Sequence, residues 1–275
     1  MTRSSSSKPF AKKSLGQNFL VDSAYIEKII TALDIQPGEA ILEIGPGRGA
    51  LTERLVEKAD HIIALELDRE FVPQLAERFS DYKNFTVVEA NALETDFFQL
   101  ISRNPKSKIE NSKCKLVANL PYYISTAILQ RLMEQRNVFT SMVLMFQREV
   151  VERITAKPRN SERGFLTVLA EAFFEIEKLF DVPPAAFRPQ PKVWSSVVRL
   201  IPKTTEIPNE ELFRELISNG FRQKRKTIVN NLKALYPNAA AILASARIDP
   251  TLRPEALNLD QWLRLAESGL KKGTK

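Results

Sequence analysis

Short apolar runs alternate with helical patterns along most of the chain. Five of these runs lie at residues 40–44, 62–67, 85–88, 116–118 and 141–146. A strand-then-helix alternation of this kind predicts a parallel sheet with helices on both faces. Two more β-like runs, at residues 173–182 and 193–201, are expected to complete one edge of that sheet. The pattern therefore predicts an α/β fold.

A helix is expected before the first strand. Asp22 can cap it, and helical spacing places four apolar residues on one face, namely Ile26, Ile29, Ile30 and Leu33. Pro37-Gly38 ends this helix.

The pattern changes after residue 201. Residues 202–208 resemble a linker, and the segment that follows has helical spacing at Leu212, Leu216 and Ile217 and again at Ile228, Val229 and Leu232. We therefore expect one domain at residues 1–201 and a small helical domain at residues 202–275. Residues 1–10 are expected to be disordered, and the polar, basic segment 102–113 to form an exposed loop.

Composition excludes several kinds of chemistry. The chain has one cysteine, Cys114, so an internal disulfide and a cysteine-built zinc site are impossible. Its one histidine, His61, begins an apolar run and is expected to be structural. We expect no metal centre, no membrane span and, because the start lacks an apolar signal region, a cytoplasmic protein. The net charge of +7 favours an anionic partner such as nucleic acid.

A glycine-rich loop follows the first predicted strand. Gly45, Gly47 and Gly49 let the backbone approach a ligand, and Glu66 ends the next strand, where a carboxylate can accept both ribose hydroxyls of an adenosine. Gly45, Gly47 and Ala50 also fit a loose G-x-G-x-x-A dinucleotide fingerprint, with Glu66 at about the acidic spacing expected for NAD, and a tight turn without a ligand is a third interpretation. Glu43, just before the loop, favours the cationic S-adenosylmethionine over a pyrophosphate.

Asn119-Leu120-Pro121-Tyr122 follows the fourth predicted strand. The exocyclic amine of adenine is a poor nucleophile because its lone pair is delocalised into the ring. The side-chain oxygen of Asn119 and the backbone carbonyl of Leu120 can accept its hydrogens and align the lone pair, while Tyr122 offers a face for stacking. The alternative is a proline-containing loop with buried tyrosines. A hydride-transferring enzyme has no use for this segment.

At these residues the sequence resembles the bacterial small-subunit (16S) rRNA adenine N6,N6-dimethyltransferases, the KsgA or RsmA family. The resemblance covers essentially the whole chain. It is carried by residues 15–20 (LGQNFL), 45–49, 66–68, 119–126 (NLPYYIST), 146–150 (FQREV), 187–193 (FRPQPKV) and 225–232 (RKTIVNNL).

The resemblance implies a seven-stranded methyltransferase sheet and a small helical C-terminal domain that binds RNA. It implies that Asn18 and the Leu20 backbone border S-adenosylmethionine, Gly45 lies against its methionine part with Gly47 in the same loop, and Glu66 takes the ribose. Asn91 would contact the cofactor adenine and Asn119 would serve cofactor and target. Phe187 would stack on the target base opposite Tyr122. The predicted RNA-binding residues are Arg222, Lys224, Arg225 and Lys226.

By the same resemblance, the substrate is expected to be two adjacent adenosines in a hairpin near the 3′ end of 16S rRNA. The enzyme is expected to act as a monomer on an assembling small ribosomal subunit, with a role in ribosome biogenesis. The sequence departs from the family at Asn91, where aspartate is usual, and at Trp194, a position that is commonly polar. A large-subunit rRNA methyltransferase of the antibiotic-resistance type, a non-catalytic ribosome-assembly factor and a transcription factor that reuses the fold are the rival interpretations.

Overall fold

The structure is a computed structural model that describes residues 17–103, 114–204, 207 and 209–270. The segment 1–10 and most of the expected loop at 102–113 lie outside the described residues. The chain forms two compact units, of which one holds the residues up to Arg148 together with Glu177–Pro202. The other holds Glu149–Ile176 and the residues from Lys203 onward. The domain boundary after residue 201 stays a prediction.

The predicted sheet is confirmed. It has seven strands in the order β4-β3-β2-β5-β6-β9-β7. In sequence order they are β2 (Ala40–Ile44), β3 (His61–Glu66), β4 (Phe85–Glu89), β5 (Cys114–Asn119), β6 (Phe139–Gln147), β7 (Phe174–Val182) and β9 (Ser195–Pro202). The strands from β4 to β6 are parallel, and β9 runs antiparallel to β6.

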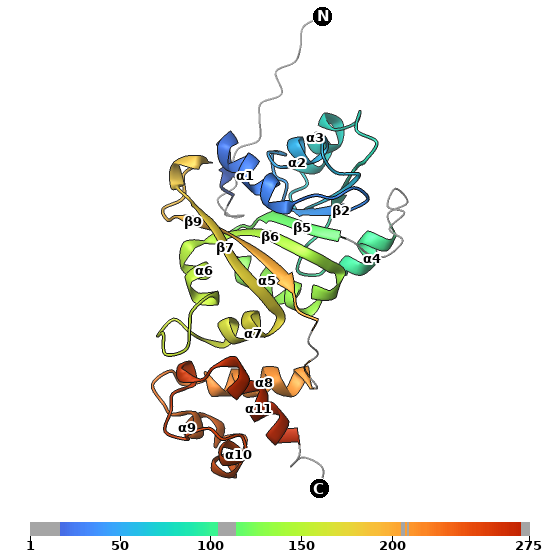
Figure 1. The fold of residues 1–275 in the computed structure, drawn as a ribbon. Helices are drawn as coiled ribbons and strands as arrows, with labels where there is room; N and C mark the ends of the chain where they lie inside the picture. The colour runs from blue at the N-terminus through green and yellow to red at the C-terminus, as the bar shows by residue number, and fades with distance from the viewer. Residues whose placement is uncertain (1–16, 104–113, 205–206, 208, 271–275) are drawn as a thin grey trace, which may run out of the picture. The chain divides into compact units, whose positions relative to one another are not determined.

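Five helices accompany the strands of the first unit, with α1–α3 on one face of the sheet and α5 on the other (Figure 1). They are α1 (Ser23–Leu33), α2 (Thr52–Leu55), α3 (Phe71–Arg78), α4 (Phe97–Ser102) and α5 (Ser125–Glu134). Short 3-10 turns cover Arg136–Val138 and Pro184–Ala186.

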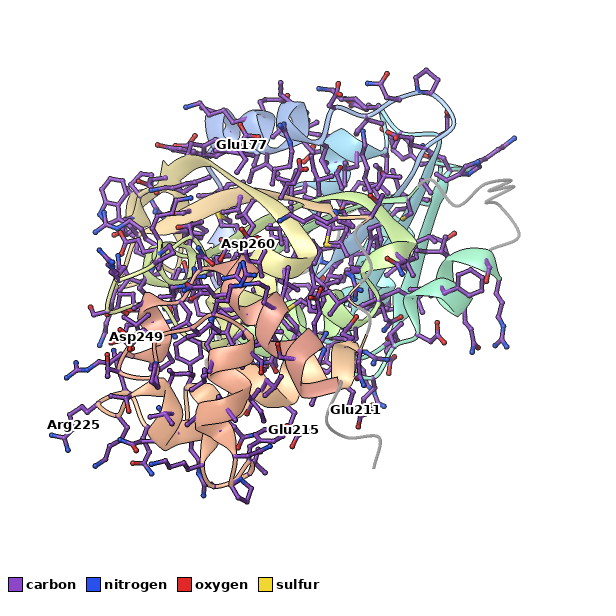
Figure 2. All side chains as sticks on the ribbon, turned by 60° about the horizontal axis from the view of Figure 1, so that its bottom comes forward. Glu177, Glu211, Glu215, Arg225, Asp249 and Asp260 are labelled. Carbon is purple, nitrogen blue, oxygen red and sulfur yellow. The ribbon has the colours of Figure 1, made fainter. Side chains whose placement is uncertain are left out.

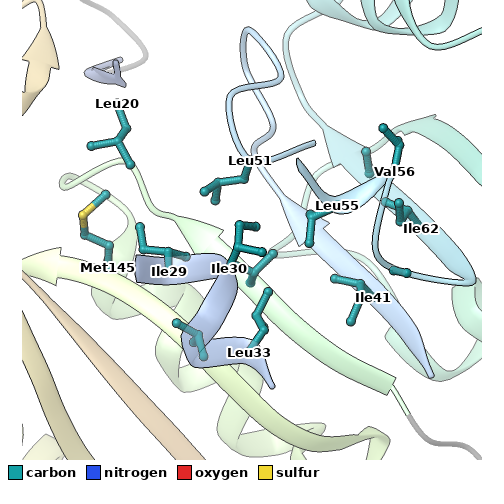
Figure 3. Close-up of a cluster of buried hydrophobic side chains, with 14 of the residues drawn as sticks. Leu20, Ile29, Ile30, Leu33, Ile41, Leu51, Leu55, Val56, Ile62 and Met145 are labelled. Carbon is teal, nitrogen blue, oxygen red and sulfur yellow. The ribbon is translucent and has the colours of Figure 1, made fainter. Parts of the chain in front are cut away.

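Helix α1 begins where the sequence predicts. The Asp22 side chain accepts a hydrogen bond from the backbone N–H of Ala24, which satisfies one of the unpaired amides at the start of the helix. Ile29, Ile30 and Leu33 are buried, and α1 packs against β6 and α2, with Ile29 beside Met145 of β6 (Figure 3). This packing covers part of one face of the sheet and positions the chain segment that leads into β2.

The described residues of the second unit are mainly helical, and they also include the first three residues of β7. It contains α6 (Arg148–Ile154, apart from its first residue), α7 (Phe165–Phe173), α8 (Glu210–Gly220), α9 (Ile228–Leu232), α10 (Ala239–Ser245), the turn Pro254–Ala256 and α11 (Leu259–Leu270). Trp262 of α11 is fully buried, and its ring stacks on Phe221 with ring centroids 5.5 Å apart. A Cβ at Gly220 would lie 2.3 Å from the Trp262 ring, so only glycine fits there.

A small second sheet was not predicted. Strands β1 (Phe19–Leu20) and β8 (Phe187–Arg188) pair antiparallel, with Leu20 opposite Phe187. Two-residue strands are too short to show an alternation of apolar and polar residues, so the sequence carries no periodic signal for them. The pairing brings the segment before α1 to the region between β7 and β9.

Candidate active site

A pocket of the first unit lies at the carboxyl edge of four neighbouring strands. Gly45 follows β2, Glu66 ends β3, Asn91 follows β4 and Asn119 ends β5, and all four line the pocket. Parallel strands bring the residues at their carboxyl ends to one edge, which is where ligands bind in sheets of this kind. Asn18, Leu20, Gly47, Leu120 and Tyr122 line the same pocket. His61 begins β3, at the opposite end of that strand from Glu66.

The Glu66 carboxylate is hydrogen-bonded to the glycine loop. One carboxylate oxygen accepts from the backbone N–H of Gly47 at 2.9 Å, and the other accepts from that of Asp68 at 2.8 Å. Each oxygen keeps a further lone pair, so the carboxylate can still accept ribose hydroxyls. Gly47 has φ +53°, and a Cβ there would lie 3.0 Å from the Phe19 ring, so this turn favours glycine.

Glu43 is a second buried carboxylate in the pocket wall. It accepts a 2.7 Å hydrogen bond from the Thr52 hydroxyl. Burial, aided by the nearby Glu66, raises the pKa of Glu43 to about 7. Burial also raises the pKa of Glu66, against the lowering effect of its backbone hydrogen bonds. A pocket with two such carboxylates favours a cationic ligand over an anionic one, which fits S-adenosylmethionine better than a dinucleotide.

Asn91 closes the turn after β4. Its side-chain oxygen accepts from the backbone N–H of Leu93 at 3.1 Å, and its side-chain nitrogen donates to the Glu94 carboxylate at 2.9 Å. An aspartate at position 91 would bring two carboxylates together, which costs free energy. Asparagine at this position avoids that repulsion and instead donates a hydrogen bond to Glu94.

The Asn119 amide is oriented by a single contact across the pocket. Its nitrogen donates to the backbone carbonyl of Asn18 at 3.1 Å. This bond uses the nitrogen and so fixes which end of the amide is the acceptor oxygen. Asn18 and Asn119 are thereby held together although they lie far apart in the sequence. Residues 120–124 connect β5 to α5 with a turn at residues 122–124, and the Leu120 side chain is buried.

Two consecutive tyrosines follow, and they differ in environment. The Tyr122 hydroxyl lies 2.6 Å from the hydroxyl of the buried Ser195 at the start of β9. Burial raises the pKa of Tyr122, so the phenol is neutral at physiological pH. Tyr123 is 57% exposed and also lines the pocket. Ser195 is the contact that the sequence analysis missed, since a serine at the start of a strand gives no signal by itself.

Phe187 does not line the pocket. It is fully buried in the hydrophobic cluster around β1 and α1, where its backbone is paired with that of Leu20. The proposed stack of Phe187 on a target base therefore has no exposed ring face in this conformation, and the role stays a prediction.

The four basic residues of the predicted RNA surface lie in the second unit, in the loop between α8 and α9. Arg222, Lys224, Arg225 and Lys226 are all exposed, and Arg225 extends into solvent (Figure 2). The buried Asn231 shapes this loop: its oxygen accepts from the N–H of Gln223 at 2.9 Å and its nitrogen donates back to the Gln223 carbonyl at 3.2 Å.

Within the described ranges, no helix is long and apolar enough to cross a membrane. The same ranges contain no group of histidine, cysteine, aspartate and glutamate side chains arranged to hold a metal ion.

Comparison with known proteins shows a full-length likeness. Residues 10–270 match the family described as ribosomal RNA adenine dimethylase. The ribosomal RNA small subunit methyltransferase A of Hahella chejuensis is 41% identical over 94% of this chain and 92% of its own.

Two solved structures also resemble this one. The dimethyladenosine transferase from Plasmodium falciparum has a TM-score of 0.78 and 29% identity, over 92% of this chain and 98% of its own. The 23S rRNA methyltransferase ErmE has a TM-score of 0.68 and 26% identity, over 91% of this chain and 99% of its own.

Proposed function

Because this chain belongs to the ribosomal RNA adenine dimethylase family, we propose specific roles for its pocket residues in that family's reaction. The reaction is the S-adenosylmethionine-dependent dimethylation of adenine in small-subunit rRNA, as in the relatives that are about 40% identical. The observation that carries the assignment of roles is the convergence of Gly45, Glu66, Asn91 and Asn119 at one sheet edge.

The cofactor supplies an electrophilic methyl group on a sulfonium. Glu66 would accept the ribose hydroxyls, and the Gly45–Gly47 loop would hold the methionine part beside the Glu43 carboxylate. Asn91 would face the adenine, with Asn18 and the Leu20 backbone at the border of the cofactor. These residues fit the cofactor because the pocket wall contains buried carboxylates that suit a cation and hydrogen-bond acceptors that suit hydroxyl and amine groups.

Asn119 and Leu120 would hold the target amine. The oriented oxygen of Asn119 and the carbonyl of Leu120 accept its hydrogens, which turns the nitrogen lone pair toward the methyl group. No side chain is required as a strong base, because the methylated nitrogen is acidic enough to lose its proton to water or to a nearby carbonyl. Alignment and electrostatics then account for the rate enhancement. Tyr122, fixed by Ser195, would stack on the base.

The substrate is proposed to be two adjacent adenosines in a hairpin near the 3′ end of 16S rRNA, within an assembling small subunit in the cytoplasm. The exposed basic loop at Arg222, Lys224, Arg225 and Lys226 would hold phosphates of this RNA. The protein is proposed to act as a monomer without a metal ion. The likeness to ErmE keeps large-subunit rRNA as the competing substrate.

Mass spectrometry of rRNA from cells with and without this protein tests the proposal. Dimethyladenosine is expected to disappear from the small-subunit rRNA alone when the protein is absent. Loss from large-subunit rRNA would support the competing substrate. No loss from either RNA would indicate an assembly factor without catalysis.

A further inference from the structure

Trp194 is an exposed aromatic residue that directly precedes Ser195, the residue in contact with Tyr122. Its side chain is 45% exposed, and the neighbouring Val193 is 39% exposed. A large aromatic side chain is usually mostly buried, because exposure of its apolar surface to water is unfavourable. The segment between β8 and β9 therefore presents a flat apolar face that packing in the fold does not explain.

The backbone is held at Trp194 and at the residue that follows it. The Trp194 carbonyl accepts from the N–H of Arg148 at 2.9 Å. The next residue, Ser195, pairs with Gln147 in the β6–β9 ladder, and its hydroxyl lies 2.6 Å from that of Tyr122. Trp194 is thus one residue away from the contact that fixes Tyr122. The segment that carries the indole therefore meets the Tyr122 side chain at Ser195.

The charge around Trp194 suits RNA. Arg188 and Lys192 are exposed on the same segment, and residues 187–195 contain no acidic residue. Arg148, whose N–H holds the Trp194 carbonyl, is also exposed. Two carboxylates belong to neighbouring elements: Asp181 is paired with Lys178 at 2.8 Å, and the exposed Glu149 follows Arg148 on α6. Aromatic faces beside basic side chains are the arrangement by which proteins bind single-stranded RNA.

We propose that Trp194 is a stacking platform for the nucleotide next to the target adenosine. The inference rests on the proposed function, and adds a second base-binding position that lies outside the pocket lined by Glu66 and Asn119. Because an indole has only two rotatable side-chain bonds, it loses little conformational entropy when a base stacks on it. The platform would thereby hold the RNA in register while one base enters the pocket.

Fluorescence tests the stacking directly. The chain has two tryptophans, and the other, Trp262, is fully buried in the second unit. Iodide is therefore expected to quench Trp194 selectively. Adding a protein-free RNA hairpin with adjacent adenosines in its loop should quench the Trp194 emission and protect it from iodide. Trp194→Phe leaves only Trp262 and should show no response to the RNA.

Affinity for the same hairpin gives a second readout. Trp194→Ala should weaken binding by about 5-fold to 100-fold, the range expected for one lost stack, while Trp194→Phe retains most of the affinity. Phe98→Ala is the matched control, because Phe98 is 60% exposed on α4 and lies outside this segment. Binding of S-adenosylmethionine should be the same in all four proteins.

Two results would overturn the inference. One is an unchanged iodide accessibility of Trp194 at saturating RNA, with unchanged affinity in Trp194→Ala. The other is protection of Trp194 only in assembled ribosomal particles and never by RNA, which would indicate a protein partner. Methyl transfer by the wild-type protein is measured in parallel. Its absence would contradict the proposed function, whereas transfer without Trp194 protection would contradict only this inference.

Discussion

The Glu66 carboxylate is expected to act on both the cofactor and the glycine loop. Glu66→Ala should weaken S-adenosylmethionine binding by about 1.5–3 kcal/mol, because it removes charge-assisted hydrogen bonds to the ribose. It also releases the backbone N–H groups of Gly47 and Asp68. Calorimetry at a temperature where the variant is folded gives the affinity. Glu89→Ala is the control, since Glu89 ends the neighbouring strand outside the pocket; equal affinities in the two variants would place the ribose elsewhere.

Glu43 should make stability depend on pH. Its pKa of about 7 in the folded protein exceeds the ordinary value of 4.5, so the folded state binds the proton more tightly than the unfolded state. The contribution of Glu43 to the free energy of unfolding is therefore fully present below pH 4.5 and is lost as the pH rises toward 7. Glutamine has no proton to lose, so the unfolding free energy of Glu43→Gln lacks this pH dependence. From pH 5 to pH 8 the variant should become more stable relative to wild type by about 3 kcal/mol. Denaturant unfolding of both proteins at pH 5 and at pH 8 measures this change. A difference between the proteins that stays constant with pH would contradict the assignment.

At the residue scale, the sequence predicted which side chains gather but not how they contact one another. Gly45, Glu66 and Asn119 were predictable because each follows a recognisable strand, and strand ends share an edge in a parallel sheet. The bond from Asn119 to the Asn18 carbonyl and the contact of Tyr122 with Ser195 join segments that are distant in the chain. Such contacts depend on tertiary packing, which no local pattern encodes.

At the scale of elements, the β1–β8 pair decides what Phe187 does. Phe187→Ala should lower the free energy of unfolding by about 3–5 kcal/mol, because the ring is fully buried. Phe187→Leu separates packing from stacking: leucine fills much of the space and has no aromatic face. If packing is the whole role, Phe187→Leu restores both stability and turnover. Thermal unfolding and methyl transfer are the measurements, and a wild-type melting temperature in Phe187→Ala would contradict the packing account.

Strands and long helices were predictable, and the shortest elements were not. The apolar run at 40–44 coincides with β2, and the Asp22 cap of α1 lies where the sequence places it. The two-residue strands β1 and β8 form because each has the other as a partner. The segment Glu149–Ile176, which contains α7 and the start of β7, belongs to the second unit, although no proline- or glycine-rich linker marks where the chain enters it.

At the scale of the whole molecule, the net charge of +7 is expected to act through local basic surfaces. Changing Arg222, Lys224, Arg225 and Lys226 to glutamine should weaken RNA binding. It should also flatten the salt dependence by about 0.7–0.9 log units of slope for each lost phosphate contact. Affinity measured over a range of salt concentrations tests this. A variant in which four lysines exposed elsewhere, Lys58, Lys83, Lys178 and Lys233, are changed to glutamine controls for the loss of four positive charges. An unaltered slope in the four-residue variant would move the RNA surface to another part of the molecule.

The central claim is that the oxygen of Asn119 holds the adenine amine during methyl transfer. The most direct measurement is mass spectrometry of small-subunit rRNA after incubation of unmodified particles with S-adenosylmethionine and either wild-type protein or Asn119→Ala. The wild-type protein should produce N6,N6-dimethyladenosine. Asn119→Ala should produce none while it retains most of its RNA affinity, because phosphate contacts dominate that affinity. Dimethyladenosine formed by Asn119→Ala at a near-wild-type rate would contradict the mechanism.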